Sequence, residues 1–173
     1  GGTDPVTCTV TNTRTTSTIT LQKVWVNGYR GDTAALAIDN AQSGSAHATS
    51  TSNGQSGSWT DTADTATFAA LSGSDVPLSE VMGTNHGQYT VDSLVCVDGD
   101  NHAVDVKGWS SGGTTGSITA PNGGTVTCTF TNNRTSTTLN LYKVWDAAAS
   151  SDVANLSIAK TTGQLSGSDS ATA

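Results

Sequence analysis

The feature that most constrains this chain is a sequence block that returns at a fixed distance. The block VTCTVTNTR at residues 6–14 returns as VTCTFTNNR at residues 126–134. Each copy is followed by a second match, ITLQKVW at residues 19–25 and LNLYKVW at residues 139–145. The offset is 120 residues throughout, as 128 minus 8 and 143 minus 23 both show. A period this long indicates tandem domains and not a short-period solenoid.

The repeat divides the chain into three parts. We expect residues 1–14 to be the last strand of one repeat, 15–134 a complete repeat, and 135–173 the N-terminal part of the next. The complete part has the size of one domain. The sequence therefore reads as a fragment of a longer array.

Two polar side chains stand where the alternation of β-strands places apolar ones. Asn132 shares a strand face with Val126, Cys128 and Phe130, and Lys23 shares one with Leu21 and Trp25. Asn12 and Lys143 take the same places in the other copies. Amides and amines are not default core residues. This matched pair of polar residues is the most informative feature of the sequence.

Short alternating segments separated by turn signals fill the complete repeat, and no segment has a helical period. We expect strands at 19–26, 35–38, 59–71, 76–80, 89–97, 103–109 and 126–132. Residues 39–58, rich in Ser, Gly, Ala and Asn, are expected to form a long loop or a weak edge hairpin, and 110–116 a loop. The pattern predicts an all-β sandwich.

Composition excludes several functions. Charged residues make up only 12% of the chain and the net charge is -7, whereas nucleic-acid binding needs a basic surface. No apolar run is long enough to span a membrane. The sequence has no nucleophile elbow, phosphate-binding loop or zinc motif, so we expect no turnover enzyme and no cofactor. Asp98, Asp100 and His102 alternate in a turn but do not follow the calcium-loop pattern, and His47 and His86 are interpreted as solvated loop residues; we expect no metal.

Three short motifs carry a family resemblance: Leu21-Gln22-Lys23, Leu78-Ser79-Glu80 and Phe130-Thr131-Asn132. In this order they resemble the SpaA-type, prealbumin-like (CnaB-like) domains of bacterial surface adhesins and pilins. The resemblance implies tandem immunoglobulin-like β-sandwiches at the cell surface. It also implies an intramolecular isopeptide bond from Lys23 to Asn132, assisted by Glu80, with Asn12 and Lys143 as the equivalent residues of neighbouring repeats.

The three residue types suit that chemistry. Amide formation needs a neutral amine, and burial lowers the pKa of a lysine while it raises that of a carboxyl group. A desolvated Lys23 beside Glu80 can therefore pass on its proton and attack the Asn132 carbonyl, with ammonia leaving. The alternative is a buried Lys23–Glu80 ion pair with Asn132 as a turn or edge residue.

The cysteines follow the repeat. Cys96 and Cys128 belong to the complete unit, and Cys8 is the copy of Cys128 in the unit before. A Cys96–Cys128 disulfide fits an exported protein. Its difficulty is register, because Val91 and Cys96 take opposite faces of a regular strand; a bulge would reconcile them. Two unpaired buried thiols are the alternative.

The favoured function is a structural repeat of an extracellular adhesin stalk or filament, whose partners are neighbouring repeats. One alternative is an adhesin module that binds a host or matrix ligand through loops 39–58 or 98–116, with Trp59 and Trp109 as the candidate anchors. Another is a filament subunit that assembles head to tail by strand exchange. We expect no nucleic-acid partner and no membrane insertion.

Overall fold

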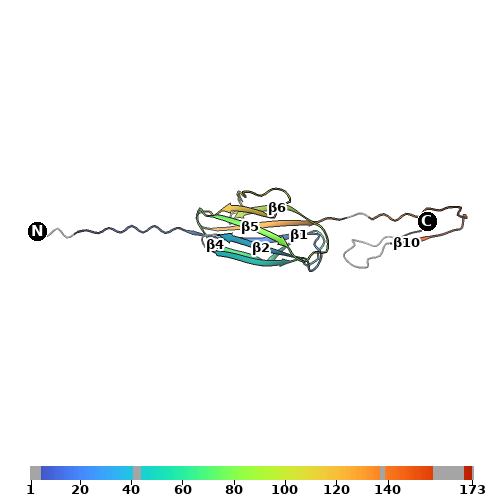
Figure 1. Ribbon diagram of the computed structural model, residues 1–173, viewed down its shortest axis with the longest axis horizontal. Coiled ribbons are helices and arrows are strands. Elements are labelled where there is room, and N and C mark those ends of the chain that lie inside the picture. Colours follow the sequence, from blue (N-terminus) through green and yellow to red (C-terminus); the bar gives the residue numbers. More distant parts are fainter. Residues whose placement is uncertain (1–4, 41–43, 137–138, 158–169, 173) are drawn as a thin grey trace.

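The computed structural model describes residues 5–40, 44–136, 139–157 and 170–172, and the regular elements among them are all β-strands (Figure 1). Within these ranges no helix has the length and apolar character needed to cross a membrane. The predicted all-β class is confirmed.

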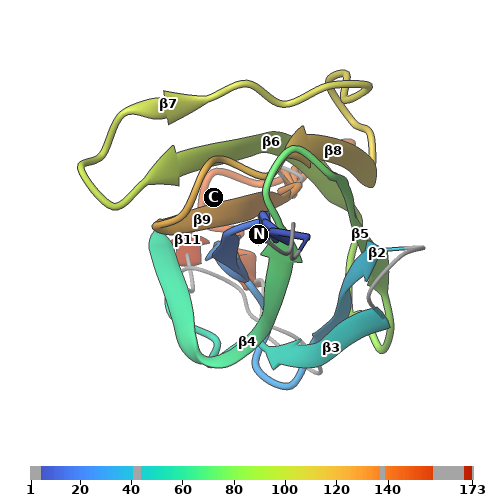
Figure 2. The ribbon, with the colours of Figure 1, turned by 90° about the vertical axis from the view of Figure 1, so that its left-hand side faces the viewer.

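Two sheets face each other across one core (Figure 2). The first has the order β4-β1-β9-β6-β7, with bounds Ser58–Leu71, Thr16–Val26, Thr125–Arg134, Tyr89–Asp98 and Ala103–Val104. The second has the order β3-β2-β5-β8, with bounds Gly44–Thr51, Thr33–Asn40, Asp75–Met82 and Thr115–Thr119. Together they form the β-sandwich expected from the sequence.

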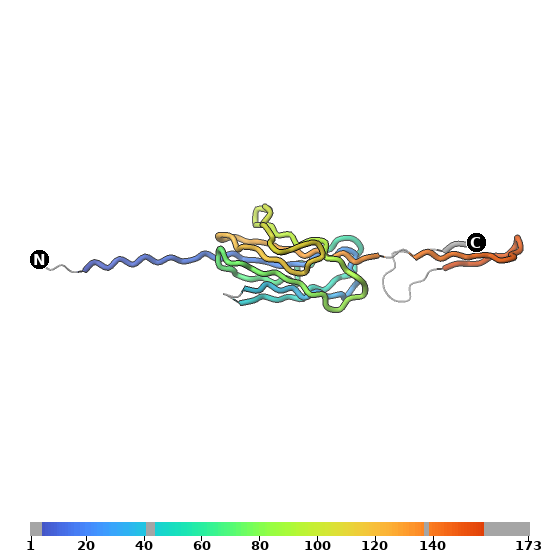
Figure 3. Tube along the Cα trace, turned by 45° about the horizontal axis from the view of Figure 1, so that its top comes forward, coloured from blue at the N-terminus to red at the C-terminus, as the bar shows by residue number. Residues whose placement is uncertain are grey.

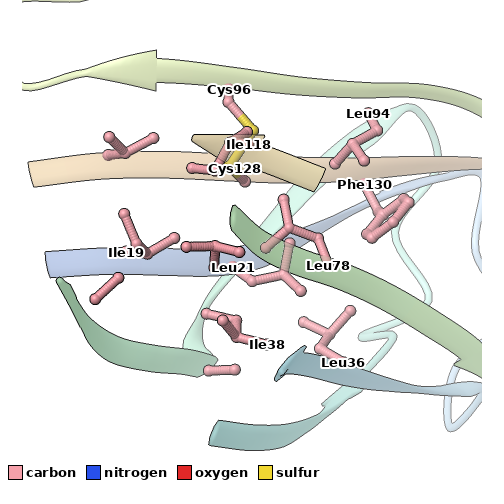
Figure 4. Close-up of a cluster of buried hydrophobic side chains, with 14 of the residues drawn as sticks. Ile19, Leu21, Leu36, Ile38, Leu78, Leu94, Cys96, Ile118, Cys128 and Phe130 are labelled. Atoms are coloured by element: carbon pink, nitrogen blue, oxygen red, sulfur yellow. A yellow bond between two sulfur atoms is a disulfide. The ribbon is translucent and has the colours of Figure 1, made fainter. Parts of the chain in front are cut away.

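Alternation along the strands builds the core. Every second residue of β1 is buried, from Ser17 to Trp25, and β9 follows the same rule from Val126 to Asn132. Figure 4 draws part of the buried apolar cluster between the sheets, which includes Ile19, Leu21, Leu36, Ile38, Leu78 and Phe130. Full burial of one such side chain stabilises the fold by about 1.5–3 kcal/mol.

The first and last strands of the domain are neighbours. β1 pairs with β9 in parallel, so that Leu21 lies opposite Cys128 and Trp25 opposite Asn132. Parallel neighbours need a crossover connection, and here the other strands of the sandwich supply it. This arrangement brings the two ends of a long sequence side by side in the sheet.

A β-bulge in β6 resolves the register conflict noted above. The pairing of β6 with β9 shifts between Val91 and Ser93. Val91 is therefore buried on the same side as Leu94 and Cys96, and Cys96 faces Cys128. The expected bulge is confirmed.

The structure decides one open alternative and changes two local expectations. Within 39–58, the hairpin alternative is correct, since β3 pairs with β2 at the edge of its sheet. The strand expected at 103–109 shrinks to β7 and one isolated pair, Lys107 with Ser117. The loop expected at 110–116 runs into β8, which the sequence concealed because Ile118 is its one fully buried apolar residue.

The flanking segments leave the sandwich at opposite ends (Figures 1 and 3). Residues 5–15 and 139–154 form no strand, so the strand expected at 1–14 is absent in its described part, and the second motif match at 139–145 forms none; residues 1–4 and 137–138 lie outside the described residues. A strand needs a hydrogen-bonded neighbour, and these segments are exposed instead. A short hairpin, β10 (Asn155–Ser157) with β11 (Ser170–Thr172), follows. The division into repeats stays a prediction.

Candidate cross-link site

Lys23 lies in the middle of β1 with its side chain fully buried. Alternation places it on the core face between Leu21 and Trp25, which are themselves buried. Its Nζ lies 5.2 Å from the centroid of the Trp25 ring. Burial lowers the pKa of Lys23 to about 8, although Glu80 opposes that shift. Burial thus favours the neutral amine that amide formation needs.

Glu80 reaches Lys23 from the opposite sheet. It lies on β5, two residues after buried Leu78, and its side chain is also fully buried. Glu80 Oε2 accepts a hydrogen bond from Lys23 Nζ at 2.5 Å. The structure thus brings together two of the three predicted residues, one from each sheet, in a buried ion pair.

Asn132 completes the group from β9. It is fully buried. In the parallel ladder Lys23 faces Phe130 and Asn132 faces Trp25, so Asn132 is the diagonal neighbour of Lys23. Both residues lie on the core face of their strands, so the long side chain of Lys23 extends on the same side of the sheet as Asn132. The alternative of Asn132 as a turn or edge residue does not fit this central, buried position.

Two buried side-chain oxygens in the described part of the chain lack a hydrogen-bond partner, Glu80 Oε1 and Asn132 Oδ1. Asn132 Nδ2 has only a sulfur acceptor, Met82 Sδ at 3.4 Å. An unsatisfied buried polar atom costs about 1–3 kcal/mol, and native proteins keep few of them. Both unsatisfied oxygens belong to the predicted group, which marks it as the chemically unusual point of the core.

The equivalent residues in the flanking segments are not brought into any such group. Asn12 and Lys143 are both exposed. Lys143 Nζ donates to the carbonyl of the adjacent Val144 at 2.9 Å. Their assignment to neighbouring repeats stays a prediction.

The disulfide between Cys96 and Cys128 is present, with an S–S distance of 2.06 Å (Figure 4). The two residues are direct cross-strand partners on β6 and β9 and are buried. Cys8 is free and exposed. The predicted pairing is confirmed. The disulfide joins β9 to β6, which is its neighbour on the side away from β1.

A second polar cluster escaped the sequence analysis. The buried carboxylate of Asp32 accepts a hydrogen bond from the Tyr89 hydroxyl at 2.6 Å and pairs with His86 Nδ1 at 2.6 Å. Burial, with the Asp32 hydrogen bond, raises the pKa of Tyr89 to about 12. His86 lies in an exposed loop, as expected, with half of its side chain accessible, but its ring also stacks on Tyr29 at 4.4 Å. One sequence signal existed, because Asp32 has a copy 120 residues later, Asp152.

The carboxylate of Asp98 accepts hydrogen bonds from the backbone of its own turn. Side-chain atoms of Asp98, Asp100 and His102 lie within 4.8 Å of one another. Asp98 Oδ1 accepts the backbone N–H groups of Asp100 and His102, each at 2.9 Å. The His102 hydrogen bond in particular lowers the pKa of Asp98. These contacts give the cluster a structural role in closing the turn.

The candidate ligand anchors are partly buried. Trp109 packs against the core and donates its Nε1–H to the Gly113 carbonyl at 2.8 Å. Trp59 is half-buried on β4. Neither residue presents the exposed aromatic surface that the ligand-binding alternative needs.

Comparison with known proteins gives one match. The family described as the prealbumin-like fold domain, of SpaA type, matches residues 18–134. Neither the curated proteins nor the solved structures gave a match. The matched range spans β1 to β9 and contains all three residues of the group as well as both cysteines of the disulfide.

Proposed function

Because the chain belongs to the family of SpaA-type prealbumin-like fold domains, we propose that it is a structural repeat of a bacterial cell-surface adhesin stalk or extracellular filament. An isopeptide bond between Lys23 and Asn132 holds the repeat together, with the Cys96–Cys128 disulfide as a second cross-link. The observation that carries the proposal is the fully buried Lys23–Glu80 pair beside an unsatisfied Asn132 carbonyl.

The reaction balances within these three side chains. Lys23 passes one proton to Glu80 along their 2.5 Å hydrogen bond, and the neutral amine attacks Cγ of Asn132. The C–N bond to the amide nitrogen breaks as the new one forms, and the departing nitrogen takes a second proton from the amine. One ammonia leaves, Lys23 keeps one N–H, and Glu80 keeps the other proton. Because each molecule reacts once, Glu80 acts in cross-linking and not in turnover.

The dry surroundings favour this reaction. Electrostatic effects are stronger in a water-excluded core than in solvent, and burial has already moved the pKa of Lys23 to about 8. The cross-link also removes a cost, because the protonated Glu80 can donate to the product carbonyl. That hydrogen bond would satisfy Glu80 Oε1 and the former Asn132 Oδ1 together.

The position of the bond suits a load-bearing domain. The flanking segments leave the sandwich at opposite ends (Figure 1), so tension along the chain enters at β1 and leaves at β9. A Lys23–Asn132 bond joins these strands directly and bypasses the 108 residues between them, residues 24–131. Tension then passes through covalent bonds and not through the hydrogen-bonded core.

Tandem repetition is supported by local structure as well as by sequence. Asn27 has a φ of 54°, and its counterpart Ala147 has a φ of 52°. The backbone N–H of Asp32 donates to Tyr29 O at 3.1 Å, and that of Asp152 donates to Ala149 O at 3.1 Å. All three residue pairs are 120 apart, so the same turn forms after both copies of the KVW motif. A disulfide-bonded repeat of this kind is suited to an extracellular location.

Force spectroscopy tests the proposal. Pulled from its ends under reducing conditions, the wild-type domain should show no unfolding extension between Lys23 and Asn132. Glu80→Ala should restore the contour length of those residues, whereas Lys143→Ala, which alters the exposed copy, should not. Full unfolding extension in the wild type would remove the load-bearing role.

A further inference from the structure

The chain is held at the N-terminal end of the sandwich by Arg14 and Thr15. Arg14 Nη2 donates to the Ser72 carbonyl in the turn between β4 and β5. The Thr15 carbonyl accepts the Ser72 N–H at 2.9 Å, and the Thr15 hydroxyl donates to Asn122 Oδ1. An Arg–Thr pair therefore fastens the incoming chain to the domain that follows it.

At the opposite end, Arg134 and Thr135 hold the outgoing chain. Arg134 Nη2 donates to the His86 carbonyl at 3.1 Å, and its guanidinium lies 5.4 Å from the centroid of the Tyr29 ring. Thr135 N–H donates to the Gln88 carbonyl at 2.9 Å. Here an Arg–Thr pair fastens the chain to the domain that precedes it.

The two pairs are the same position of the repeat, because 134 minus 14 and 135 minus 15 both give 120. Each pair shows one half of the contacts that a boundary between two complete domains would make. We propose that the Arg–Thr pair at each boundary is a clamp held by both neighbouring domains at once. Successive repeats then dock end to end in a fixed orientation. This inference rests on the tandem arrangement proposed above.

The two sets of contacts are compatible on one dipeptide. Threonine uses its backbone N–H toward the preceding domain and its carbonyl toward the following one, so these bonds do not compete. Arginine has five N–H donors in a planar fork, enough for the two carbonyls represented by His86 and Ser72. Two groups donate on both sides. Arginine Nη2 carries two N–H groups, one for each carbonyl, whereas the threonine hydroxyl has one O–H, which donates toward Gln88 O in one case and Asn122 Oδ1 in the other.

The fit around Arg134 is close. A Cβ on Gly87 would come within 2.7 Å of Arg134 Nε. His86, whose carbonyl accepts from Arg134, is itself fixed by its ring contacts with Asp32 and Tyr29. The partner surface is therefore built and not a mobile loop end, and its partner is a second copy of this repeat.

The test uses the full chain with one extra repeat, made by joining residues 1–134 to residues 15–173. Every buried apolar residue of the described chain lies between Ile19 and Phe130, so each complete repeat keeps its own core. The new boundary has the sequence Arg134-Thr15, as in the native Arg134-Thr135. Cys8→Ser and an exposed Thr67→Cys in each repeat allow two spin labels to report the distance between domains.

With the clamp formed, the two spin labels should give one narrow distance distribution. Arg134→Gln at the new boundary should broaden this distribution to about twice its width or more, because the joint between the domains becomes flexible. Arg14→Gln is the matched control, since it removes the same side chain where no complete domain precedes it, and should change nothing. Gly87→Ala in the preceding repeat should broaden the distribution without removing the guanidinium.

A broad distribution in the unaltered two-repeat chain would overturn the clamp, and so would a narrow one that persists in both Arg134→Gln and Gly87→Ala. The intact mass of the same samples reports the Lys23–Asn132 bond in each repeat. Loss of ammonia together with a broad distribution would contradict the clamp alone, whereas retention of ammonia would contradict the cross-link.

Discussion

Two regions of this chain carry nearly the same sequence in opposite surroundings. In the complete repeat Trp25 is 1% exposed, whereas its copy Trp145 is 39% exposed. Leu21 is fully buried and Leu141 is 49% exposed. Lys23 is buried against Glu80, while Lys143 is exposed and donates to the adjacent backbone carbonyl.

The comparison separates what a local sequence specifies from what the fold supplies. The lysine ammonium lies near the tryptophan ring in both copies, at 5.2 Å and 4.6 Å from the centroid. The turn that follows is also shared. Burial, the carboxylate and the amide belong to the complete repeat alone, because they come from β5 and β9. The reactivity proposed for Lys23 therefore depends on the closed sandwich.

The largest expected effect is that of Glu80→Ala. It leaves Lys23 buried without its partner, which costs about 3–5 kcal/mol, and it prevents the covalent bond. Denaturant unfolding of the reduced chain should show this loss. Lys143→Ala, which removes the exposed copy of Lys23, should stay within about 0.5 kcal/mol of the wild type. Equal, small effects in both variants would mean that the buried Lys23–Glu80 pair matters no more than the exposed lysine.

The disulfide should contribute less. Its sequence separation is 32 residues, for which the loop-closure estimate is about 3.7 kcal/mol. Replacing Cys96 and Cys128 together by Ala should lower the free energy of unfolding by up to that amount, and by less while the Lys23–Asn132 bond already restrains β9. Cys8→Ser, at the exposed copy of Cys128, should have no effect. If the double cysteine variant is as stable as the wild type, the disulfide contributes nothing to the free energy of unfolding.

Stability of the chain without the isopeptide bond should depend on pH through Lys23. In Asn132→Ala the lysine remains free, with a folded pKa of about 8 against an ordinary value of 10.5. Between these values the unfolded chain binds more protons than the folded one, so stability rises with pH, by about 3 kcal/mol. Below pH 8 the cost of the buried charge is fully present.

The double variant Asn132→Ala, Lys23→Met isolates that effect. It lacks the titrating amine but keeps Tyr89, whose raised pKa acts in the opposite direction above pH 10. The difference between the two variants between pH 8 and pH 10.5 should rise with pH. A flat difference would show that Lys23 titrates normally in the fold.

The smallest perturbation is chemical labelling, which leaves the fold intact. Lys143 is exposed and should react promptly with an amine-specific reagent, whereas Lys23 should stay unmodified in the native chain. Peptide mapping after labelling gives the result. Equal labelling of the two lysines would contradict the burial of Lys23.

Much of this arrangement follows from period-2 alternation. It placed Lys23, Glu80 and Asn132 on core faces, and it exposed the register conflict at Val91 that the bulge resolves. It did not place β8, whose small residues give a weak pattern. Nor did it reveal the pairing of Asp32 with His86, because that contact joins two loops through the closed sandwich.

The flanking segments show that alternation by itself does not predict a strand. Their alternation equals that of β1 and β9, yet the described residues form no strands there. A β-strand depends on neighbours that the local sequence does not contain. Alternation therefore reports which face a residue would take, and the fold decides whether that face exists.

The intact mass of the reduced, denatured 173-residue chain shows directly whether the Lys23–Asn132 isopeptide bond forms. We expect a mass one ammonia below that of the sequence, from Lys23 and Asn132 alone, with no second loss at Asn12 or Lys143. Tandem mass spectrometry should place the loss on a branched peptide that joins Lys23 to Asn132, which distinguishes it from cyclisation at Asn–Gly pairs such as Asn27-Gly28. Glu80→Ala should restore the full mass. A wild-type chain of full sequence mass would mean that the isopeptide bond does not form.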